Sequence, residues 1–236
     1  MTNFIKLHLS FVFNQLMIIT IVILELICLS GIIYASNIIN GFTYMDSFRN
    51  EFTVSYINDT FIILEVIIVI IAIFSATILQ SKSNNYLMSY TTYSKIDKLF
   101  FIIAKIIVGI LLIGILLFFN YLMFNLINKF TPYQIDNNYI MKTYFYLFIE
   151  AMQMFAFTLA LLSVINHIFI SIIPITLFWY LETIINNHNK FNDFLLAIFI
   201  NINPYINKKH IIYIPLLIIL IILLNYIFIT YKKDCF

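Results

Sequence analysis

Four glutamates and one lysine lie inside long apolar stretches of this 236-residue chain: Glu25, Glu65, Glu150, Glu182 and Lys105. Burying an ionised side chain in hydrocarbon costs several kcal/mol unless the group is paired, hydrated or neutral. Carboxyl groups in such positions mark substrate or proton pathways, or they hydrogen-bond one helix to another. The chemistry open to this chain is therefore that of binding and transfer through an apolar region.

One further polar residue, Gln153, lies three positions after Glu150 and therefore on the same face of a helix. We assign these two, with Glu25 and Glu65, as candidates for a substrate path: an acidic cleft for a cationic or amphipathic molecule. Protonated carboxyls that join helices are the alternative interpretation. For Glu182 and Lys105 we favour a structural role near the membrane interface.

The composition indicates an all-α integral membrane protein. The chain is 63% hydrophobic and 10% charged, whereas soluble domains carry about 25% charged residues. The apolar runs are continuous rather than alternating, which favours membrane helices over a barrel. The net charge of +2 gives no indication of a nucleic-acid partner.

Six runs have the length of a membrane-spanning helix, about 20 residues. They are Leu16–Ser36, Phe61–Leu79, Phe100–Phe124, Tyr144–Leu162, Val164–Ile184 and Ile211–Ile229. The fourth and fifth are separated by a predicted tight turn at Ser163–His167, because one helix over both would be about 60 Å long. Residues 1–236 thus form a single membrane domain.

Four polar segments flank these spans. Met1–Asn14 reads either as an amphipathic lead-in whose Lys6 and His8 can face lipid headgroups or, equally, as the plain start of the first helix. Asn37–Thr60 reads as a loop, Gln80–Leu99 as one or two short interfacial helices, and Asn186–His210 as a short interfacial hairpin before the last span. Six spans place both termini on one side. Lys and Arg are divided equally between the two sides, so charge alone does not set the orientation, and we take the termini as cytoplasmic.

The sequence contains none of the motifs that we would expect of an enzyme. It has no Gly-x-x-x-x-Gly-Lys-Ser/Thr loop for nucleotide phosphates. Its four histidines are scattered without metal-ligand spacing. We therefore predict no cofactor, no metal and no catalytic activity in this chain.

The layout resembles the permease subunit of ABC exporters of the second export class (ABC type 2 permeases). The shared features are six spans, an amphipathic lead-in, a helical segment between spans two and three, and an interfacial hairpin before span six. In the family that segment often reads Leu-Leu-Ser-x-Pro, then Ser-Arg or Ser-Lys, then a lysine entering span three. Tyr86–Lys95 followed by Lys105 is similar, without the proline. Asn203-Pro204-Tyr205 is similar to a further family feature.

The resemblance implies a mechanism. Two permease chains, identical or different, form the path, and two copies of a separate cytoplasmic ATPase bind ATP and magnesium. The segment between spans two and three acts as a coupling helix in an ATPase groove. Its apolar face and the lysines at its rim are Tyr86, Leu87, Met88, Tyr90, Lys82, Lys95 and Lys98. A membrane-surface helix anchored by tyrosines and lysines is the alternative for this segment.

In size and composition the chain resembles small permeases of bacteriocin self-protection and peptide-toxin export in low-GC Gram-positive bacteria. The expected function is ATP-driven export of amphipathic peptides or other hydrophobic or cationic molecules across the bacterial plasma membrane. Two alternatives stay open. One is a proton-coupled secondary transporter that uses Glu25, Glu65 and Glu150. The other is a non-transporting immunity or scaffold subunit.

Overall fold

The computed structural model describes residues 1–13, 22–23, 26, 49–130, 136–165 and 213–233. Every regular element in these ranges is an α-helix. The helices are α1 (Thr2–Val12), α3 (Arg49–Leu79), α4 (Lys82–Thr91), α5 (Lys95–Phe130), α6 (Asn137–Ile165) and α9 (Tyr213–Lys233). The all-helical fold class is confirmed for this part of the chain.

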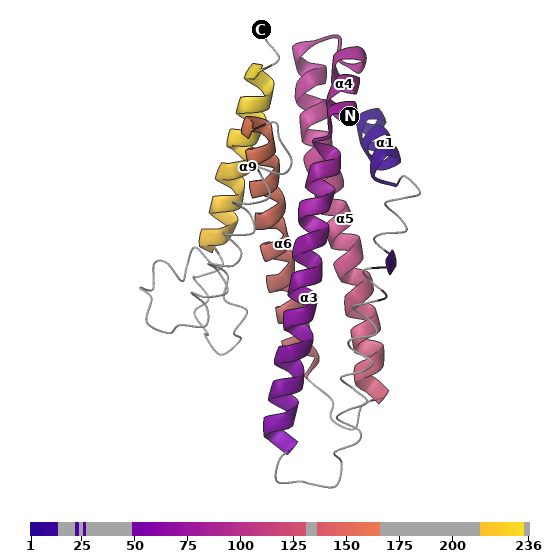
Figure 1. Cartoon of the computed structure of the whole chain (residues 1–236), viewed down its shortest axis with the longest axis vertical. Coiled ribbons are helices and arrows are strands. Elements are labelled where there is room, and N and C mark those ends of the chain that lie inside the picture. The colour runs from indigo at the N-terminus through magenta and orange to yellow at the C-terminus, as the bar shows by residue number, and fades with distance from the viewer. Residues whose placement is uncertain (14–21, 24–25, 27–48, 131–135, 166–212, 234–236) are drawn as a thin grey trace.

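Four long helices, α3, α5, α6 and α9, lie side by side in a bundle (Figure 1). Helix α6 packs against α3, α5 and α9, and α5 packs against α3 and α9. The short helix α4 lies at one end of the bundle, and α1 packs against α5 and α3 near the same end. Helices α3 and α9 end there, and α5 begins there.

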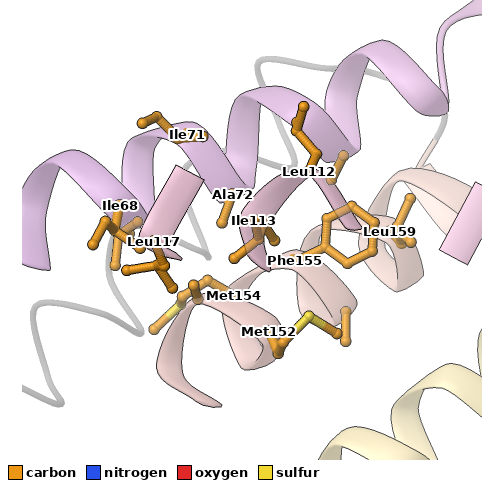
Figure 2. Close-up of a cluster of buried hydrophobic side chains, with 14 of the residues drawn as sticks. Ile68, Ile71, Ala72, Leu112, Ile113, Leu117, Met152, Met154, Phe155 and Leu159 are labelled. Carbon is orange, nitrogen blue, oxygen red and sulfur yellow. The ribbon is translucent and has the colours of Figure 1, made fainter. Parts of the chain in front are cut away.

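In the middle of the bundle, apolar side chains of α3, α5 and α6 pack around Phe155. Figure 2 shows Ala72 of α3 and Leu112 and Ile113 of α5 on the side of the Phe155 ring of α6. All four are buried. Gly109 of α5 lets this ring approach closely, because a Cβ at that position would collide with the Phe155 ring. The helices are therefore held in the middle of the bundle by close apolar packing.

Among the helices of the described residues, two are long and apolar enough to cross a membrane, over Lys95–Lys129 and Asn137–Ile165. Shorter apolar stretches, Leu64–Leu79 and Leu216–Tyr231, lie in α3 and α9. Helix α5 is apolar all round, with Leu112 and Leu117 buried and Leu111, Phe118 and Phe119 exposed. A helix that is apolar on every side is typical of a membrane span or of a large protein core.

The helices extend beyond the predicted spans. Helix α3 begins at Arg49, so the loop predicted over Asn37–Thr60 is wrong from that residue onward. Helix α5 runs from Lys95 to Phe130 rather than from Phe100 to Phe124. The reason is physical: an apolar run marks where hydrocarbon would lie, whereas a helix continues until a cap or a proline stops it. For α5, Pro132 follows two residues after its end.

The same extension occurs in the two later helices. Helix α6 begins at Asn137 rather than Tyr144, and α9 continues to Lys233, beyond the predicted end of the last span at Ile229. The predicted turn at Ser163–His167 is wrong for its first three residues, which belong to α6. The Ser163 hydroxyl donates to the Ala160 carbonyl, 2.6 Å away, so this serine is satisfied within the helix. The remainder of that turn lies outside the described residues.

Three predicted elements fall largely or wholly outside the residues that the structure describes. They are span one (Leu16–Ser36), span five (Val164–Ile184) and the hairpin Asn186–His210. Two expectations in the described part are confirmed: a helix at the start of the chain, and a short helix between the second and third predicted spans.

Candidate functional site

Helix α4 is a short polar helix tied to the end of α3. Its first turn is capped by Ser81, whose side-chain oxygen accepts from the Asn84 backbone N–H at 3.4 Å. The Asn84 side-chain amide donates to the Leu79 carbonyl at 2.7 Å, and the Asn85 amide donates to the Gln80 carbonyl at 3.2 Å. Carbonyls at the C-terminal end of a helix have no partner within it. The two asparagines satisfy these carbonyls and fix the corner between α3 and α4.

A polar network lies beneath this corner. It comprises His8, Gln80, Asn84, Asn85, Lys105 and Tyr226, which belong to α1, α4, α5, α9 and the α3–α4 junction. The Lys105 ammonium donates to Asn85 Oδ1 at 2.5 Å and to Gln80 Oε1 at 3.4 Å. The Tyr226 hydroxyl donates to the same Gln80 oxygen at 3.0 Å. The Lys105 and Tyr226 side chains are fully buried, where unsatisfied polar groups are costly.

His8 joins α1 to this network. Its Nε2 atom lies 3.2 Å from the Phe101 carbonyl oxygen, and its ring packs edge-on against the Phe101 ring at 4.4 Å. The side chain is fully buried. Burial first, and the positive charge of Lys105 second, lower the His8 pKa to about 4, so the imidazole is neutral at pH 7. The expectation that His8 faces lipid headgroups is wrong, because the inner face of α1 packs against α5.

A second lysine, Lys98, attaches the end of α9 to α5. Its ammonium donates to the Tyr231 carbonyl at 3.1 Å and lies 5.7 Å from the centre of the Tyr231 ring. A cation near the last carbonyls of a helix is favourable there. Lys98 was predicted to lie at the rim of a coupling surface, but it is almost completely buried against α9. The other rim residue with a described side chain, Lys95, is exposed.

The outward surface of α4 is aromatic. Tyr86 is 67% exposed and Tyr90 is 72% exposed, and they lie one turn apart on the same side. Met88 lies on the opposite side, is 6% exposed and packs inward. The expectation that Met88 shares a face with the two tyrosines is therefore wrong, because residues two apart in a helix point in opposite directions. The side chains of Leu87 and Lys82 lie outside the described part.

The predicted substrate-path residues are only partly placed. Glu150 and Gln153 lie one turn apart on α6, and each is 1% exposed. Glu65 is half-buried on α3, the helix that packs against α6. Glu25 falls outside the described residues. Among the residues that the structure describes, no group of three or more His, Cys, Asp or Glu side chains could hold a metal ion.

Sequence reasoning missed the polar network. Its residues carry a signal that could have indicated it, since Gln80, Asn84 and Asn85 cluster at the end of an apolar run. Tyr226 gives no such signal, because a tyrosine near the end of a span is typical of the membrane interface. Comparisons with protein-family models, curated proteins and solved structures find no match to this chain.

Proposed function

We propose that this chain is the membrane-spanning permease subunit of an ATP-driven ABC exporter in a bacterial plasma membrane. The observation that carries the proposal is the short helix α4, which is fixed to the bundle by its inner side and exposes Tyr86 and Tyr90 on its outer side. A chain without a nucleotide-binding motif needs such a rigid contact to receive force from an ATPase.

The outer surface of the bundle supports placement in a membrane. Helix α9 exposes six large apolar side chains: Leu216, Leu217, Leu220, Ile221, Leu224 and Phe228. Soluble proteins rarely expose contiguous apolar surface of this kind. Lipid tails would cover it without cost, because they are themselves apolar.

The arrangement of the ends supports the orientation. Helix α1 and the last turn of α9 lie at the α4 end of the bundle (Figure 1), as the contacts of His8 with Phe101 and of Lys98 with Tyr231 require. We assign this end to the cytoplasm, where the ATPase would bind. Exposed aromatic side chains one turn apart on the same face of a helix are suited to insertion into an apolar groove.

Glu150 and Gln153 supply the substrate side of the proposal. Both are buried in the middle of α6, the helix that contacts three others. A carboxyl group at that depth suits a cationic or amphipathic cargo. The expected cargo is an amphipathic peptide or another hydrophobic or cationic molecule that is moved outward.

The test is purification of the full-length tagged chain from membranes of its native host. We expect a stoichiometric ATPase with a Walker motif to co-purify, and we expect Tyr86→Ala with Tyr90→Ala to abolish its recovery. Tyr93→Ala is the matched control, because Tyr93 is 93% exposed but lies beyond the end of α4. Recovery of no ATPase, or equal loss with the control, would contradict the proposal.

A further inference from the structure

The polar network connects α4 to α9, although the two helices are more than 120 residues apart in the sequence. Gln80 Oε1 accepts two hydrogen bonds, one from Lys105 of α5 and one from Tyr226 of α9. Lys105 also donates to Asn85 of α4. One ammonium group therefore joins α4, α5 and, through a shared oxygen, α9.

We propose that Lys105 is a positioning residue that makes α4 and α9 move as one rigid body. The role of this movement would be to carry force from an ATPase into the membrane, and that role rests on the proposed function. The rigid connection itself does not depend on any partner.

Hydrogen bonds can fix the direction of α4, whereas the apolar packing of this short helix cannot. Among the α4 side chains that the structure describes, only Asn84 and Met88 are buried. One buried methionine does little to fix the direction of a helix, since it adapts to many shapes. The orientation of α4 is therefore set by its asparagines and by the donor that Lys105 provides.

The surroundings of Lys105 keep its ammonium group in place. The side chain is fully buried, and its nitrogen lies 5.3 Å from the centre of the Phe101 ring. The neighbouring His8 is neutral, so it does not repel the ammonium group. In such an environment of low polarity, hydrogen bonds to a charged donor are stronger than in water.

A second attachment strengthens the connection to α9. Lys98 lies seven residues before Lys105, two turns away on the same face of α5. It holds the Tyr231 carbonyl of α9, five residues after Tyr226. Helix α9 is thus held to α5 near its end, while Lys105 brings α4 into the same unit.

The connection can be measured by the distance between spin labels just after α4 and on α9. The labels are attached at Tyr93→Cys, which directly follows α4 and lies outside its ATPase-facing side, and at Phe228→Cys in α9. Both positions are exposed, and the full-length protein carries Cys28→Ser and Cys235→Ser in lipid nanodiscs. Pulsed electron resonance gives the distribution of distances. We expect a narrow distribution in the parent protein and one broadened at least about twofold in Lys105→Met, because α4 then loses its donor.

Two further variants separate positioning from general damage. Lys105→Arg keeps the donors and should retain the narrow distribution, whereas Lys95→Met removes an exposed lysine nearby and should change nothing. Should Lys105→Met fail to accumulate, Tyr226→Phe removes only the α9 donor and should broaden the distribution by itself. An unchanged width in Lys105→Met or in Tyr226→Phe, or equal broadening in Lys105→Arg, would overturn the inference.

The same labels separate this inference from the proposed function. The widths are measured without any ATPase, so absence of an ATPase partner contradicts only the proposed function. Where the ATPase co-purifies, Mg²⁺ and a non-hydrolysable ATP analogue should leave the distance unchanged in the parent protein. In Lys105→Met the same addition should shift it, since α4 then moves alone. A shift in the parent protein would contradict movement as one body.

Discussion

The α4 end of the bundle and its middle are held together by different forces. At the α4 end, side chains of α4, α5, α9 and the α3–α4 junction meet through hydrogen bonds around Lys105 and Gln80. In the middle, Phe155 packs over Gly109 among aliphatic side chains (Figure 2). The first arrangement fixes directions, whereas the second fixes only how closely the helices approach.

This difference teaches which changes each region can accept. Apolar packing tolerates exchange of one aliphatic side chain for another of equal volume. A buried hydrogen-bond network does not tolerate loss of one member, because its partners are left unsatisfied. We therefore expect sensitivity to chemistry at the α4 end and sensitivity to volume in the middle.

The largest expected effect is acid destabilisation at the α4 end. The His8 pKa lies near 4 in the folded protein and at 6.5 without burial, so the unfolded state binds the proton more tightly. Stability is then unaffected above pH 6.5, falls as the pH decreases through this interval, and has lost up to about 3 kcal/mol below pH 4. The measurement is the pH dependence of thermal unfolding in nanodiscs.

His8→Gln is the control for this effect, since glutamine keeps a hydrogen-bonding group and does not titrate. Carboxyl groups elsewhere titrate equally in both proteins and cancel in the difference. The variant should be less sensitive to acid than the parent between pH 6.5 and 4. If stability fell equally with pH in the two proteins, protonation of His8 would not be what destabilises the fold.

A smaller effect is expected from added volume in the middle. In Gly109→Ala the new Cβ collides with the Phe155 ring, which is fully buried. Overpacking of this kind lowers the free energy of unfolding by about 1–3 kcal/mol. Thermal unfolding in nanodiscs measures it.

Gly114→Ala is the matched control on the same helix. There the nearest atom to the new Cβ belongs to Phe148 at 3.8 Å, an ordinary contact. This variant should be neutral or more stable by up to about 1 kcal/mol, because alanine favours a helix over glycine. Equal destabilisation by both alanines would mean that loss of glycine, and not contact with Phe155, is responsible.

The smallest effect concerns the start of α5. Ser94 and Asp97 form a reciprocal cap, in which Ser94 Oγ accepts from the Asp97 N–H at 3.1 Å and Asp97 Oδ2 accepts from the Ser94 N–H at 3.2 Å. Ser94→Ala should cost about 1 kcal/mol. Hydrogen exchange in the first turn of α5 should accelerate, and Ser94→Asp should restore it. Unchanged exchange in Ser94→Ala would show that the cap contributes nothing.

The sequence predicted helix type well and helix ends poorly. Apolar runs located α5, α6 and α9, because such long runs have no other stable form in lipid. The same signal placed the start of α3 twelve residues too late, at Phe61 rather than Arg49. Polar residues can continue the backbone hydrogen bonds of a helix beyond its apolar part. Composition alone therefore cannot show where the helix begins.

The candidate site was predictable as a segment and not as a geometry. The lack of Gly and Pro in Gln80–Leu99 indicated helix, and Tyr86 and Tyr90 were assigned to an exposed function. The inward direction of Met88 follows from helical spacing and was overlooked. The contact between Gln80 and Tyr226 could not be foreseen, because it joins residues 146 positions apart through the packing of whole helices.

Helix α1 and the last turn of α9 lie at the same end of the bundle, and this limits how many times the chain can cross a membrane between them. Under the proposed placement in a membrane, a chain whose first and last described helices lie at one end of the bundle crosses the bilayer an even number of times. Fluorescent reporters fused to either terminus would therefore light up in the same compartment.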